Sequence, residues 1–171
     1  MSTPLPSLTD VTVAIRWNRR STTSTGDLDL SAFLLTPDDR VPSDTGFVFF
    51  NNLLSPDGSS RLTVADDADA AEAERLTIDL SKVPSSIVSI VVAVTMYDGA
   101  GVFGDLDGAR ITVADARIGA VADFELGSSF PTSQALVYGI VVRDGARWTF
   151  RAAGRQYPDL LAIAKEFGVN V

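Results

Sequence analysis

Acidic and amide side chains are concentrated at a few places in this sequence. Asp27 and Asp29 are spaced by one residue at the start of an expected strand, so both carboxylates point to the same side. Hard cations such as Ca²⁺ bind carboxylate and carbonyl oxygens. These residue types therefore suggest cation binding. The candidate ligands are Asp27, Asp29, Asn51, Asn52, Asp66, Asp67, Glu72, Glu74 and Asp98.

Each group of candidates also has a simpler interpretation. An Asp-x-Asp pair is often a solvated strand face, and Asn51-Asn52 can close a turn through side-chain hydrogen bonds. Residues 66–74 (DDADAAEAE) form either an acidic loop with helical turns or a set of repelling carboxylates bridged by a cation. Asp98 follows the most apolar stretch, where a ligand at a strand end would lie. The residues alone leave both interpretations open.

Two short motifs in the sequence match known ligand-binding patterns only in part. Residues 99–104 (GAGVFG) match the dinucleotide pattern GxGxxG, but that pattern needs a helix to follow, and here DLDG and an expected strand follow. Asp27–Ser31 resembles the start of an EF-hand loop, but the sixth position is Ala32, where the sharp turn requires Gly. The sequence predicts neither nucleotide binding nor an EF-hand.

The composition argues against several classes of function. The 171 residues include no His and no Cys, which removes the usual general base, thiolate metal sites and disulfides. No catalytic constellation is present, so we expect a protein that is not an enzyme. The net charge of −8 favours neither nucleic acid nor anionic membranes as partners. Solubility alone also explains an acidic surface.

Alternating apolar residues predict many short strands that would position the acidic groups. The expected strands are 11–17, 28–35, 47–50, 76–80, 87–97, 109–114, 121–126, 135–142 and 147–152, with a turn at 55–58 (SPDG). Asp144-Gly145 predicts a hairpin. The last segment predicts a helix, with Pro158 and Asp159 at its start, Gly168 at its end and an apolar stripe that includes Leu160 and Ile163.

These elements predict an all-β fold. We expect one domain over residues 1–171, a β-sandwich of two mostly antiparallel sheets with a short C-terminal helix. The N-terminus has no signal-peptide pattern, and the apolar run Ile87–Met96 is too short to span a bilayer as a helix. We therefore expect a cytoplasmic protein without direct membrane insertion.

Taken together and in this order, the segments resemble the TerD family of tellurium-resistance and general stress proteins. The resemblance runs from about Val11 to Val171 and rests on GDLDLSAFLL, FVFFNNLLSPDGS, ERLTIDLSKVPSSIVSIVVAVTMYDG and the C-terminal ALVYGIVVRDGARWTFRAAGRQYPDLLAIAKEFGVNV. It implies a β-sandwich that binds calcium through acidic loops at one end. It also implies a non-enzymatic role, with other stress-response or membrane-associated proteins as partners.

The resemblance implies that the residues at matching positions bind calcium. Asp27 and Asp29 match the aspartate-rich strand start of the family, and Asn51-Asn52 match its Asn pair. Asp66-Asp67 match the first acidic element of its long loop, and Glu72 with Glu74 match the second. Asp98 matches the Asp of its Tyr-Asp element. The sequence departs from the family at Thr25, where an Asp is usual, and in its shorter, Ala-rich acidic loop. These departures favour the alternative of a metal-free scaffold or interaction module.

Overall fold

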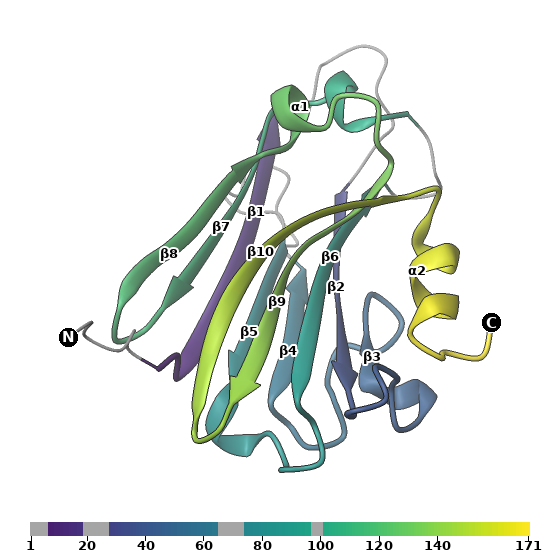
Figure 1. Cartoon of the computed structure of the whole chain (residues 1–171). Helices are drawn as coiled ribbons and strands as arrows, with labels where there is room; N and C mark the ends of the chain where they lie inside the picture. Colours follow the sequence, from purple (N-terminus) through teal and green to yellow (C-terminus); the bar gives the residue numbers. More distant parts are fainter. Residues whose placement is uncertain (1–6, 19–27, 65–73, 97–100) are drawn as a thin grey trace.

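The fold consists of two five-stranded antiparallel sheets packed face to face (Figure 1). The computed structural model describes residues 7–18, 28–64, 74–96 and 101–171. We call the sheet with strand order β4-β5-β1-β7-β8 sheet A, and the sheet with order β10-β9-β6-β2-β3 sheet B. The strands are β1 (Asp10–Asn18), β2 (Leu28–Leu35), β3 (Phe47–Val48), β4 (Ser60–Val64), β5 (Glu74–Asp79), β6 (Ser89–Met96), β7 (Asp107–Asp115), β8 (Gly119–Glu125), β9 (Ala135–Asp144) and β10 (Arg147–Tyr157). The helices are α1 (Leu126–Ser129), α2 (Leu160–Glu166) and the 3₁₀ turns η1 (Asp44–Gly46), η2 (Leu80–Lys82) and η4 (Phe103–Asp105).

The main core lies between the sheets, as the alternation in the sequence predicts. Val11, Val13 and Ile15 of β1 are buried against Leu28 and Leu30 of β2 and other inward-facing residues. Successive side chains of a strand point to opposite faces, so these residues share one face of their strands. The expected β-sandwich with a short C-terminal helix is confirmed.

A second apolar cluster lies on the outer face of sheet B, where α2 packs. It contains Phe33, Val91 and Val137 from the sheet and Ile163 and Ala164 from the helix. Asp159 caps α2 by accepting the Ala162 N–H at 2.8 Å. Gly168 follows the helix with a φ of 82°, a conformation that glycine adopts without steric cost. The predicted end and apolar stripe of this helix are confirmed, whereas its start lies later than predicted, because Leu160 is the first helical residue and Pro158 precedes the cap.

Several predicted boundaries differ from the structure. The strand expected at 47–50 ends at Val48, because Phe49 and Asn52 exchange backbone hydrogen bonds in a tight turn. Strand β4 was not expected, because only Leu62 of its five residues is both apolar and buried. The expected strand 147–152 continues to Tyr157 through an irregularity between Ala152 and Arg155. Glu74, placed in an acidic loop by the sequence, begins β5.

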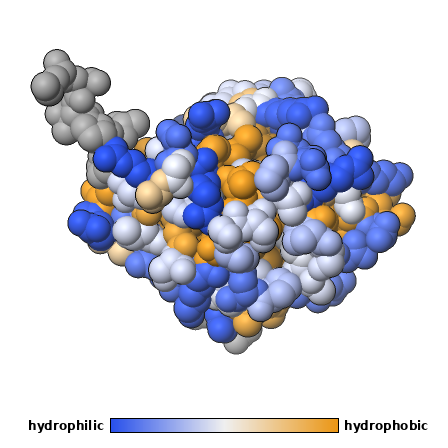
Figure 2. Space-filling model, turned by 60° about the horizontal axis from the view of Figure 1, so that its bottom comes forward, coloured by the Kyte–Doolittle hydropathy of each residue, from blue (hydrophilic) through white to orange (hydrophobic). Residues whose placement is uncertain are grey.

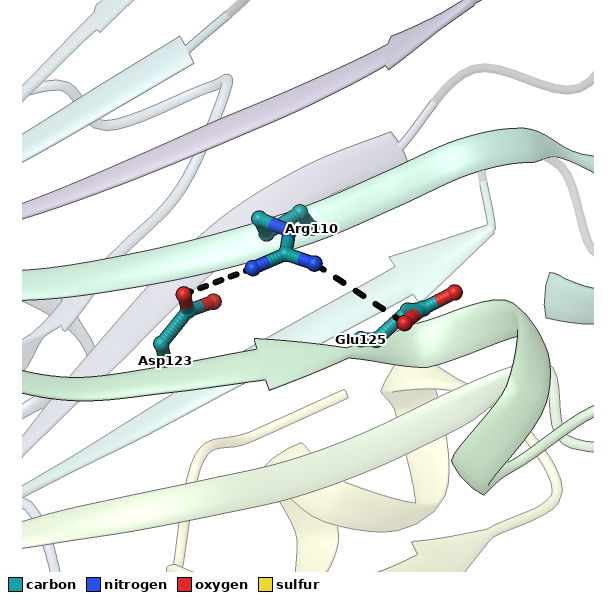
Figure 3. A network of polar contacts seen from close by, with 3 residues as sticks. All are labelled: Arg110, Asp123 and Glu125. Carbon is teal, nitrogen blue, oxygen red and sulfur yellow. Dashed lines mark hydrogen bonds and ion pairs between the residues drawn. The ribbon is translucent and has the colours of Figure 1, made fainter.

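An ion-pair network joins β7 and β8 on the exposed surface of sheet A (Figure 3). The Arg110 guanidinium lies 2.7 Å from the Asp123 carboxylate and 3.8 Å from that of Glu125. About half of each side chain is exposed, so water and salt screen these pairs and each contributes less than about 1 kcal/mol. No helix in the described residues is long and apolar enough to cross a membrane.

Candidate functional site

The described strand ends next to the acidic segments gather at one end of the sandwich. Ile15 pairs with Glu74, and Val64 pairs with Glu74 from the other side. In sheet B, Leu28 pairs with Met96. These strand ends lie toward the top of Figure 1. Antiparallel pairing thus brings together strands that are distant in sequence, and it places the two described acidic candidates, Asp29 and Glu74, at the same end.

Glu74 connects the two sheets at this end. Its side chain faces inward and the residue is only 5% exposed. The Oε1 atom accepts the backbone N–H of Leu30 at 3.2 Å. Strand β3 pairs with β2 only at Ala32 and Phe33, so Leu30 lies beyond the end of that pairing. A buried N–H without a partner is costly, and Glu74 supplies an acceptor in place of a neighbouring strand.

Asp29 and Ser31 lie on the other face of β2, the outer face of sheet B. They alternate with the inward-facing Leu28 and Leu30. Asp29 is half-buried, whereas Ser31 is 1% exposed and its hydroxyl has no hydrogen-bond partner within the described ranges. The side-chain oxygens of Asp29 and Ser31 therefore lie on the outer face of β2. Glu74 reaches the same strand from the interior of the sandwich, at Leu30.

Two further buried polar atoms lack partners in the described part of the chain. They are the Tyr138 hydroxyl and the indole nitrogen of Trp17. Tyr138 is fully buried in the main core. Burial, followed by the negative charge of Glu74, raises the pKa of the Tyr138 hydroxyl well above its ordinary value. Tyr138 therefore stays protonated and can donate a hydrogen bond in the same interior that holds the Glu74 carboxylate.

Asn52 has a structural contact in the turn after β3. Its Nδ2 donates to the carbonyl oxygens of Phe47 at 2.7 Å and Thr45 at 3.1 Å. This geometry supports the turn interpretation of the Asn pair, and the backbone carbonyl of Asn52 accepts the Phe49 N–H in the same turn. Asn51 is exposed at the tip of the turn.

The described residues do not contain a complete metal centre. Within them, no group of three or more Asp, Glu, His or Cys side chains converges. The other predicted ligands, Asp27, Asp66, Asp67, Glu72 and Asp98, lie outside the described residues. At the GxGxxG pattern, the described part forms the short turn η4 and then β7, so no α-helix begins there to bind a phosphate.

Ser31 and Tyr138 were not predicted as site residues. Ser31 had a signal in the sequence, because it falls two residues after Asp29 on the same strand face. Tyr138 had none, since it lies within an apolar run and only sheet packing brings it into the same interior as Glu74.

Comparisons with known proteins agree on one family. The family described as the TerD domain matches residues 1–167. The chain is 37% identical to "Tellurium resistance protein TerD" of Serratia marcescens, covering 99% of this chain and 93% of that protein. It is 29% identical to "General stress protein 16U" of Bacillus subtilis, over 97% and 91% of the two chains. A crystal structure of a homologue of telluride resistance protein (TerD) from Streptomyces coelicolor has a TM-score of 0.76 at 21% identity, covering 92% of this chain and 95% of that one, which supports the fold.

Proposed function

Because the chain belongs to the TerD family, we propose that it acts in tellurium resistance or a general stress response as a calcium-binding, non-enzymatic interaction module. Calcium would neutralise the clustered carboxylates and hold one end of the sandwich rigid for a partner. The absence of His and Cys from the sequence supports a role without acid–base or thiol catalysis.

The position of Glu74 carries this proposal. A carboxylate held at the junction of the two sheets, at the end where the flanking strands of all three acidic segments meet, suits a hard-cation ligand. Asp29 and Ser31 of β2 add oxygen donors of the type that calcium prefers. The remaining ligands would come from Asp27, Asp66, Asp67, Glu72 and Asp98.

Calcium should stabilise the chain against unfolding. A ligand that binds only the folded state at about one hundred times its Kd stabilises it by about 2.7 kcal/mol. For a chain of this size, that corresponds to a rise in Tm of roughly 5–10 °C. Thermal unfolding with added CaCl2 against EDTA, together with titration calorimetry, measures both effects.

Two variants test whether the site lies at the proposed end. Glu74→Gln keeps an acceptor for Leu30 but removes the charge, so we expect most of the calcium-induced rise in Tm to disappear. Asp10→Asn removes an exposed carboxylate from the opposite end of β1 and should leave the rise unchanged. The absence of both heat and a Tm shift in the wild-type chain would refute calcium binding.

A metal-free scaffold is the second candidate. It is favoured by the amide of Asn52, which is used for turn hydrogen bonds, and by the absence of a converging acidic group among the described residues. In that case Glu74 has a structural role that includes accepting the Leu30 N–H, and Glu74→Gln should respond equally with or without calcium.

A further inference from the structure

Helix α2 covers only part of the outer face of sheet B. Over β6, β9 and β10 the face forms an open groove of about 490 Å³, which ends beneath α2. Its floor is apolar and is formed by Val91, Val137, Ile140, Val142 and Ala153. Figure 2 shows apolar residues in a hollow between hydrophilic rims on the face turned forward there.

The groove has the width of a helix. Neighbouring strands lie about 4.8 Å apart, so β6, β9 and β10 together span about 10 Å, close to the diameter of an α-helix. The adjacent strip of the same face already binds a helix, since Ile163 and Ala164 of α2 pack on it. Ile140 and Val142 are only partly buried, so an apolar helix face would remove them from water.

The rim of the groove along β10 is basic, although the chain has a net charge of −8 and Asp39 and Glu166 line the groove elsewhere. Arg151 and Arg155 of β10 line the groove, and Arg147 lies four residues before Arg151 on the same strand face. Arg155 lies 2.5 Å from Glu166 of α2, whereas Arg151 is exposed and has no ion pair within the described ranges. Four residues of a strand span about 13 Å, so the Cα atoms of Arg147, Arg151 and Arg155 are evenly spaced along β10, and we call these three residues the arginine row.

We propose that this groove binds an amphipathic helix of a partner protein, with its apolar side on the floor and acidic residues along the flank facing β10. Apolar contact supplies binding free energy, and the arginine row fixes the orientation of the helix by charge complementarity. A second copy of the chain fits less well. Its surface is acidic overall, whereas the groove suits a segment with an apolar stripe and acidic residues along one flank of that stripe. The site uses described residues of sheet B and does not depend on the calcium proposal.

A synthetic peptide provides the test. The probe is an amidated 14-residue helix with Leu on one face and Glu along one flank; the control peptide has Lys in place of Glu. Methyl NMR of the full chain should show shifts at Ile140 and Val142 with the Glu peptide. The Lys peptide should bind at least about tenfold more weakly, because the row of arginines would repel it. Equal binding of both peptides, or shifts elsewhere only, would overturn the proposal.

Matched variants locate the charge effect. Arg151→Glu should weaken binding of the Glu peptide about tenfold without changing Tm, since the side chain is exposed and forms no ion pair with another described residue. Arg61→Glu makes the same charge change on the outer side of sheet A and should have no effect. Equal losses for both variants would mean non-specific electrostatics. If ultracentrifugation instead reveals concentration-dependent dimers that block peptide binding, this result would reject a partner helix. Binding of dodecanoate at Ile140, with no binding of the Glu peptide, would reject it as well.

Discussion

Replacing Asp115 by Ala should lower the free energy of unfolding by about 3 kcal/mol. Asp115 is 3% exposed, and its carboxylate accepts four backbone N–H groups, from Thr9 at 2.7 Å, Asp10 at 3.1 Å, Arg117 at 2.9 Å and Ile118 at 3.2 Å. Hydrogen bonds to charged groups contribute about 1.5–3 kcal/mol each, but they are not additive at one acceptor. The carboxylate joins the start of β1 to the β7–β8 turn, so both should loosen. Urea denaturation measures the loss.

The same carboxylate should make stability depend on pH. Burial alone would raise the pKa of Asp115, but its backbone hydrogen bonds outweigh this effect and lower the pKa below its ordinary value of 3.8. The unfolded chain therefore takes up the proton first as the pH falls. The stabilisation by Asp115 is complete above pH 3.8 and is lost as the pH falls through the folded pKa. The difference in free energy of unfolding between wild type and Asp115→Asn should therefore shrink over that pH range.

Asp123→Asn is the control for both measurements. The Asp123 carboxylate is half exposed, and its ion pair within the described residues is the surface contact with Arg110, so its loss should cost less than about 1 kcal/mol. If Asp115→Ala were no more damaging than Asp123→Asn, the contacts assigned to Asp115 would not hold the turn.

Phe33→Ala should be the most destabilising single change we consider, at about 3–5 kcal/mol. Phe33 is fully buried on the outer face of sheet B. Its ring stacks on Phe47 with centroids 4.5 Å apart and lies 5.3 Å from the ring of Phe167, which follows α2. Removing the ring leaves a cavity between the sheet and the C-terminal segment, so the docking of α2 should weaken as well.

Phe50→Ala gives a matched comparison for this cavity. Phe50 is the same residue type but is 43% exposed, so its removal should cost well under 2 kcal/mol. Chemical denaturation followed by the fluorescence of Trp17 and Trp148 compares the two variants. Similar losses would contradict a packed apolar layer beneath α2.

Local sequence patterns predicted most of the strands because alternation records which face is buried. Leu28–Leu35 was predicted with its observed boundaries, and the end of α2 at Gly168 followed from a residue type that suits helix C-termini. The pattern missed β4, a five-residue strand that pairs with β5 and has three exposed residues, Arg61, Thr63 and Val64. It also extended β3 too far, because Phe49 and Phe50 look like strand residues although Asn52 closes a turn there.

The sequence by itself determined the β-rich class, the C-terminal helix, the absence of His and Cys, and which residues carry ligand oxygens. Tertiary structure alone decided that Glu74 faces inward to accept the Leu30 N–H, that Tyr138 shares its interior, and that a basic rim borders an apolar groove. The physical reason is that these relations depend on pairing between strands distant in the chain. Glu74 and Leu30 are 44 residues apart, and no local propensity specifies which strands meet across a sandwich.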